Sequence, residues 1–198
     1  MNDHTFTFAE LEFLAGDEPS WPDVRALLSI GSSGDAVAAA GASSLVMRGL
    51  AQATAGGFNV RTDVRAHVAL LFRPSRVITI TRGDATGLNL ALALLPASGA
   101  PTCLVSLGGP GVYEVSVLKP SEDPGAQLRD VILALAREGR TALTIGPKDA
   151  PGELLISHDS GTWTLGRTAD ERSAQGTSDD ESAVAASLEA WLRTWLAG

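Results

Sequence analysis

Cysteine, lysine and long apolar runs are scarce in this chain of 198 residues. Its one cysteine, Cys103, cannot form an intramolecular disulfide, so we expect a protein of the reducing cytoplasm. No apolar run is long enough to span a membrane, and the acidic first segment lacks the basic start and apolar core of a signal peptide. Basic residues are outnumbered 15 to 23, which argues against binding to nucleic acid or to anionic lipid.

Length and composition predict one globular domain with a short appendage. The chain is 44% hydrophobic and 19% charged, which is ordinary for a folded protein of this size. We expect an α+β domain over residues 1–167, a flexible linker of small polar residues over 168–178, and an amphipathic helix over 179–198.

Helical signals dominate the N-terminal third. Thr7 and Glu10 fit a capping box, with Phe6 and Leu11 as its hydrophobic staple, and Gly16 ends the helix. Further start and stop residues predict helices over residues 20–30, 35–56 and 62–72.

The apolar period then changes from 3.6 to 2, which indicates strands. Four strands are expected at Val77–Thr81, Leu88–Leu94, Thr102–Leu107 and Val112–Leu118. Their connections are short and rich in Gly and Pro, so the pairing should be an antiparallel meander, with Leu90 and Leu92 buried.

The remaining third alternates a helix, strands and a helix. Asp123 is expected to cap a helix over 124–138, and strands should follow at 141–145, 154–157 and 162–165. Ser178 and Glu181 fit a capping box for the last helix. The fold class is therefore α+β, with helices packed against an antiparallel sheet, because strand–helix–strand alternation is too sparse for a parallel doubly wound sheet.

Glycine-rich segments offer no phosphate-binding loop. Residues 31–34 (Gly-Ser-Ser-Gly) precede a helix, but they lack the Lys-Ser/Thr ending of a P-loop, and Asp35 would repel an anion there. Residues 108–111 lie between two strands and open no helix, so we interpret them as a turn.

Residues that could carry catalysis are dispersed along the chain. His4, His67 and His158 fall in three unrelated segments, and Cys103 lies on a strand, where a buried and inert thiol is the common case. No Gly-x-Ser-x-Gly elbow occurs. We therefore assign no catalytic, cofactor-binding or metal-ligating residue and no cofactor, and we expect a protein that is not an enzyme.

Two further features have both a structural and a functional interpretation. The acidic pairs Glu10/Glu12 and Asp179/Asp180 belong to helix starts, where they favour the helix dipole. Trp191 and Trp195 lie on the apolar stripe of the last helix, which either packs on the core or docks on another protein.

One layout resembles a known family. It consists of Ser44–Leu50 with its Arg-Gly-Leu step, Val60–Pro74, the strand Val77–Thr81, the meander Leu88–Leu118 and the helix Pro124–Glu138. This order resembles the EspG family of cytosolic, non-enzymatic chaperones in actinobacterial type VII (ESX) secretion. Members of that family contain two similar halves, and this chain is expected to match one half plus a tail.

The resemblance implies a chaperone that binds helical secreted proteins, although no short motif assigns its contact residues. One alternative is a small regulatory, adaptor or immunity-type protein, and another is an enzyme or ligand-binding protein with a pocket between sheet and helices. An unpaired half would expose apolar surface, so we expect a homodimer, or else a C-terminal helix that folds back over that surface.

Overall fold

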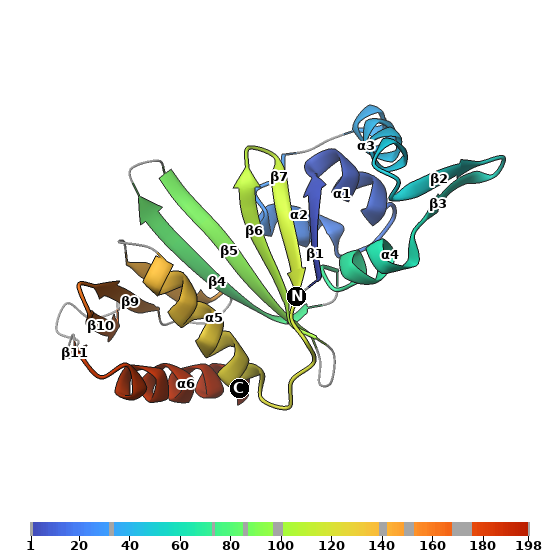
Figure 1. Ribbon diagram of the computed structural model, residues 1–198. Helices are drawn as coiled ribbons and strands as arrows, with labels where there is room; N and C mark the ends of the chain where they lie inside the picture. Colours follow the sequence, from blue (N-terminus) through green and yellow to red (C-terminus); the bar gives the residue numbers. More distant parts are fainter. Residues whose placement is uncertain are drawn as a thin grey trace.

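The computed structural model describes residues 2–31, 34–72, 74–84, 87–96, 101–138, 142–148, 153–167 and 176–197 (Figure 1). The helices are α1 (Phe8–Ala15), α2 (Trp21–Leu27), α3 (Asp35–Met47), α4 (Thr62–Ala69), α5 (Pro124–Glu138) and α6 (Glu181–Ala197). The strands are β1 (Asn2–Thr7), β2 (Ala51–Thr54), β3 (Gly57–Val60), β4 (Pro74–Asp84), β5 (Gly87–Pro96), β6 (Cys103–Gly109), β7 (Val112–Val117), β8 (Leu143–Pro147), β9 (Leu154–Asp159), β10 (Thr162–Arg167) and β11 (Gly176–Ser178).

Nine of these strands form one antiparallel sheet in the order β1-β7-β6-β5-β4-β8-β9-β10-β11. The predicted meander is β4 to β7, and the later strands form a second meander. The two meanders meet where Ile80 of β4 pairs with Ile145 of β8. The α+β class with helices against an antiparallel sheet is confirmed. Strands β2 and β3 form a separate hairpin that projects from the rest of the molecule (Figure 1).

The two ends of the sheet bury opposite faces. Alternate residues of β5 divide between two hydrophobic cores: Leu94 belongs to a core with α1 to α4, whereas Ala93 and Leu95 belong to a core with α5 and α6. On β6, Cys103 and Val105 likewise join the first core. Because side chains alternate across a strand, the N-terminal helices and the C-terminal helices cover different faces. The result is two lobes that share one sheet.

The start of α1 is built as its sequence predicts. The Glu10 amide donates to Thr7 Oγ1 at 3.2 Å, and the Thr7 amide donates to Glu10 Oε2 at 2.8 Å, which completes the capping box. Phe6 and Leu11 are fully buried in the same core. The expected N-terminal helical third is nevertheless wrong at residues 2–7, which form β1 at the edge of the sheet beside β7. Pairing with a distant strand decides this segment, and local helix signals carry no information about it.

Glu10 also holds α3 against α1. Its side chain is fully buried and accepts hydrogen bonds from Ser44 Oγ and from Arg48 Nη1, each at 2.7 Å. Arg48 Nη2 also donates to the carbonyl of Thr5 at 2.7 Å. One buried carboxylate therefore ties β1, α1 and α3 together, and the dipole role expected for the pair Glu10/Glu12 describes only part of its function.

The helix expected over 35–56 ends instead at Met47. The Leu50 amide donates to the Leu45 carbonyl at 2.8 Å and the Gly49 amide to the Val46 carbonyl at 3.0 Å. This is a Schellman motif, in which Gly49 takes a positive φ of 69° that is unfavourable for residues with a Cβ. The Arg-Gly-Leu step thus ends the helix, and residues 51–60 form the β2–β3 hairpin.

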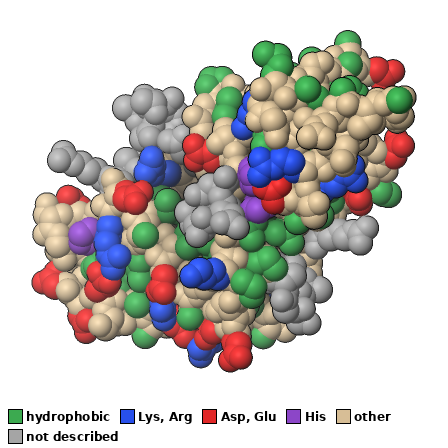
Figure 2. All heavy atoms as spheres, turned by 45° about the vertical axis from the view of Figure 1, so that its right-hand side comes forward, with side chains coloured by type: hydrophobic (Ala, Val, Ile, Leu, Met, Phe, Trp, Pro, Cys, Tyr) green, Lys and Arg blue, Asp and Glu red, His purple; other side chains and the backbone are tan. Residues whose placement is uncertain are grey.

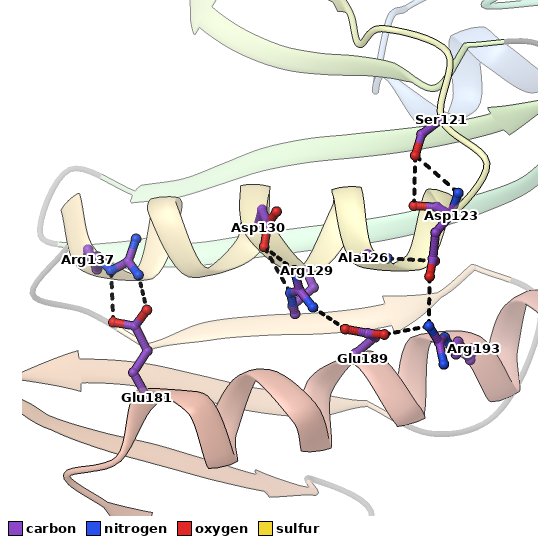
Figure 3. A network of polar contacts seen from close by, with 9 residues as sticks. All are labelled: Ser121, Asp123, Ala126, Arg129, Asp130, Arg137, Glu181, Glu189 and Arg193. Atoms are coloured by element: carbon purple, nitrogen blue, oxygen red, sulfur yellow. Dashed lines mark hydrogen bonds and ion pairs between the residues drawn. The ribbon is translucent and has the colours of Figure 1, made fainter.

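Ion pairs join α6 to α5 (Figure 3). Arg137 pairs with Glu181, Arg129 pairs with Glu189, and Arg193 bridges Glu189 and Asp123. The expected cap of α5 by Asp123 is confirmed, because the Ala126 amide donates to Asp123 Oδ1 at 2.9 Å; this bond and the Arg193 guanidinium lower the pKa of Asp123.

The expected capping box of α6 is wrong. Asp180 accepts from the Ser182 amide at 2.9 Å, while Glu181 is engaged by Arg137. Val184, Leu188 and Leu192 are buried in the second core, and Trp191 and Trp195 pack against that core half-buried. The core-packing interpretation of this helix is therefore confirmed.

Some expectations fall partly or wholly outside the described residues. In the expected linker 168–178, residues 176–178 form β11 and the others are outside the described part of the chain. Leu90 and Leu92 lie on the strand β5, as expected. Their side chains are not among those that the structure describes, so their expected burial stays a prediction.

Gly41→Ala tests the close crossing of α1 and α3. A Cβ at position 41 would lie 1.9 Å from the Ala9 carbonyl oxygen, so the two helices must move apart. We expect the free energy of unfolding to fall by about 2 kcal/mol in urea denaturation, even though alanine favours helix more than glycine does. Gly31→Ala is the control, because its Cβ meets nothing within 4 Å. Equal stability of the two variants would contradict the close crossing.

Glu10→Ala and Arg48→Ala, with the double variant, test the buried ion pair. Each single change leaves a charged partner unpaired; since Arg48 is 39% exposed, we expect a loss of about 2 kcal/mol each, below the usual cost for a fully buried pair. The double variant should lose about 1 kcal/mol less than the sum of the singles. Strictly additive losses would show that the two side chains are not coupled.

Candidate protein-interaction surface

The candidate catalytic residues, the three histidines and Cys103, do not form a reactive centre in the described part of the chain. Cys103 is fully buried, and burial raises the pKa of its thiol to about 12, so the thiol stays protonated. His158 lies on the β9–β10 hairpin with its ring 4.5 Å from that of Trp163. Among the described residues, no group of three or more His, Cys, Asp or Glu side chains could hold a metal ion.

Two of the three histidines are brought together, which the sequence does not indicate. The rings of His4 on β1 and His67 on α4 lie edge to face with centroids 4.5 Å apart. Asp63 Oδ2 lies 3.8 Å from His4 Nε2, and the Asp63 carbonyl lies 2.7 Å from His67 Nδ1. Figure 2 shows histidine side chains beside basic and acidic ones near the middle of the face in view.

The glycine-rich segments have structural roles. Arg25 Nη2 donates to the Gly31 carbonyl at 2.6 Å, and residues 32 and 33 are outside the described residues. Residues 110–111 form the turn between β6 and β7, with Gly111 at a φ of 69°. The turn expected over residues 108–111 is confirmed for these two residues, whereas Gly108 and Gly109 belong to β6.

The most unusual surface is the one formed by α3 and the β2–β3 hairpin. Residues 36–60 contain one charged side chain, Arg48, although the chain as a whole is 19% charged. After Asp35, the outward residues of α3 are small or apolar, and its last residue, Met47, is 87% exposed. Apolar side chains are visible at the top of Figure 2, the level at which α3 lies in Figure 1. Depletion of charge with exposed Met and Phe is typical of protein-binding surfaces.

An apolar groove of about 530 Å³ lies beside this hairpin, between α1, β3 and α4. Its buried members are Ala15, Val60, Val68 and Phe72. Phe13 and Phe58 stand above them with their rings edge to face at 5.4 Å. Phe58 is 43% exposed. Glu18 and Arg65 also line the groove. The walls of the groove come from three separate segments of the chain. The only sign of it in the sequence is therefore the absence of charge in residues 49–60.

The orientation of α1 and α4 is fixed from outside the groove. Trp21 stacks edge to face on Phe72 with centroids 5.8 Å apart, and its indole N–H donates to Glu12 at 3.0 Å. Glu12 in turn pairs with Arg25 at 3.6 Å. These contacts brace the elements that form the groove, which favours a preformed binding surface.

Stability should depend on pH through His4. Burial lowers the pKa of His4 from 6.5, His67, Arg61 and Arg48 lower it further, and Asp63 opposes them. Below pH 6.5 the unfolded chain therefore binds a proton at His4 that the folded chain does not bind, so the free energy of unfolding is largest above 6.5 and falls as the pH drops below it.

Urea unfolding of wild type and His4→Asn at about pH 7.5 and about pH 5.5 measures this term. The variant should lose less stability between the two pH values than the wild type does. An identical pH dependence in both proteins would contradict the role of His4.

Comparison with known proteins points to the fold alone. No family model and no curated protein sequence matches this chain. Among solved structures, it is similar to a chain in the structure of the Mycobacterium tuberculosis type VII secretion system chaperone EspG5 in complex with a PE25–PPE41 dimer. The identity is 11% and the TM-score 0.53.

This similarity covers 98% of the present chain and 96% of the other. It therefore extends beyond the single half expected from the sequence. The second meander and α6, interpreted from the sequence as a hairpin and a tail, are part of the shared architecture. The homodimer was expected because of an unpaired half, which this coverage does not support, and it stays a prediction.

Proposed function

We propose that this protein is a non-enzymatic chaperone that binds a helical protein partner, of the kind handled by type VII secretion. The observation that carries the proposal is the exposed, charge-poor surface of α3 and the β2–β3 hairpin with the adjoining groove. Such a surface costs free energy while it faces water and loses that cost when a partner covers it.

The fold similarity adds the type of partner to this proposal. The solved neighbour is a secretion chaperone in complex with a PE25–PPE41 dimer, and a shared fold is compatible with a shared mode of action. In the described residues, no helix is both long and apolar enough to cross a membrane. We place the action of the protein in the cytoplasm, where the thiol of Cys103 would remain reduced.

Co-expression with its captured partner tests the proposal. A partner identified by affinity capture from the native host should form a stoichiometric complex in size-exclusion chromatography with light scattering. A chaperone should also keep that partner in solution, whereas the partner expressed alone should aggregate. A partner that is equally well behaved alone would favour an adaptor or immunity role, and a protein that forms no such complex would refute the proposal.

A further inference from the structure

We infer that the groove between α1, β3 and α4 binds one amphipathic helix of a partner protein, and that this helix runs antiparallel to α4. The inference rests on the proposed function, because it assigns a site and an orientation to the partner. Two observations support it, the apolar lining and the charges at the two ends of the groove, together with the spacing of those ends that follows from the sequence separation.

The lining provides the apolar contact that such a helix needs. The partly buried Phe13 and the exposed Phe58 form an aromatic wall, and Val68 of α4 and Phe72, which follows α4, lie buried below them. Ala69 lines the groove with an exposed small side chain, which leaves room along α4. A partner helix would place apolar residues at i, i+3, i+4 and i+7 against these groups.

Opposite charges mark the two ends of the groove. The Ser20 hydroxyl donates to the Phe72 carbonyl at 2.6 Å and lies 3.4 Å from Glu18 Oε1, so the acidic end adjoins the chain just after α4. Arg65 lies on α4, seven residues before Phe72, and the chain continues past Ala69 in hydrogen-bonded turns, so the two positions are about 10 Å apart along this segment. In the described part of the chain, no ion pair or hydrogen bond engages the Arg65 guanidinium.

This arrangement fits the dipole of a helix of about two turns. A helix N-terminus carries partial positive charge and its C-terminus partial negative charge, so the N-terminus belongs near Glu18 and the C-terminus near Arg65. Since α4 runs from Arg65 toward Phe72, the bound helix is antiparallel to α4. Basic residues in its first turn and acidic residues in its last turn would strengthen binding.

Two stapled helical peptides of about 10 residues test the inference, because the charges in their first and last turns then lie about 10 Å apart. Both carry leucines along one face; the first has lysines in the first turn and glutamates in the last turn, and the second has these charges exchanged. Fluorescence anisotropy with the full-length protein should give a Kd below about 100 µM for the first peptide and about tenfold weaker binding for the second.

Protein variants then locate the site. Ala69→Trp should fill the groove and abolish binding, and Arg65→Glu should weaken the first peptide about tenfold. Lys148→Glu makes the same charge change at an exposed site in the other lobe, so it should bind like wild type. The double variant E18K/R65E should reverse the preference and favour the second peptide. Circular dichroism confirms that each variant is folded.

Three results would overturn the inference: no binding of either peptide up to about 1 mM, equal binding of a proline-interrupted peptide, or an unchanged preference in E18K/R65E. Since the peptides are synthetic, these results are independent of whether the native complex forms. Loss of the native complex alone would refute the proposed function and leave the peptide result standing.

Discussion

The buried carboxylate of Glu10 is the interaction on which the N-terminal lobe depends. It caps α1, accepts from Ser44 on α3 and pairs with Arg48, which also holds the carbonyl of Thr5 on β1. A fully buried charge is tolerated only when it is paired and hydrogen-bonded. These partners together satisfy that requirement for the Glu10 carboxylate. Because Gly41 lets α3 approach α1 closely, the same contacts decide which side of α3 faces outward.

That orientation creates the exposed surface. With its Gly41 and Leu45 side against α1, the helix directs Met47 toward solvent, and Gly49 ends it where the hairpin begins. The hairpin then places Phe58 opposite Phe13. One ion pair between α1 and the end of α3 thus affects the position of residues two elements away, because packed elements transmit orientation from one contact to the next.

The two lobes separate stability from binding. The C-terminal lobe closes its core with α5 and α6, and the ion pairs between these helices lie at the rim of buried Leu128, Ile132 and Leu188. In the N-terminal lobe, the charge-poor surface and the groove lie outside a core that is already closed by Trp21 and Phe72. A partner can therefore bind there without opening either core, which agrees with the small conformational changes of preformed interfaces.

Local signals in the sequence predicted much of the secondary structure. The box Thr7–Glu10, the cap Asp123 and the alternation from Val77 onward each describe contacts between residues close in the chain, so periodicity and capping chemistry suffice to find them. Lack of charge over residues 36–60 was likewise present in the sequence alone. The sequence alone did not indicate the edge strand β1 or the contact between His4 and His67, because both arise from pairing between distant segments. The groove likewise depends on contacts between distant segments. Phe58 reaches Phe13 and Phe72 because the ion pair of Glu10 and Arg48 sets the position of α3 and of the hairpin that follows it. That ion pair is a tertiary contact, which local sequence patterns do not reveal.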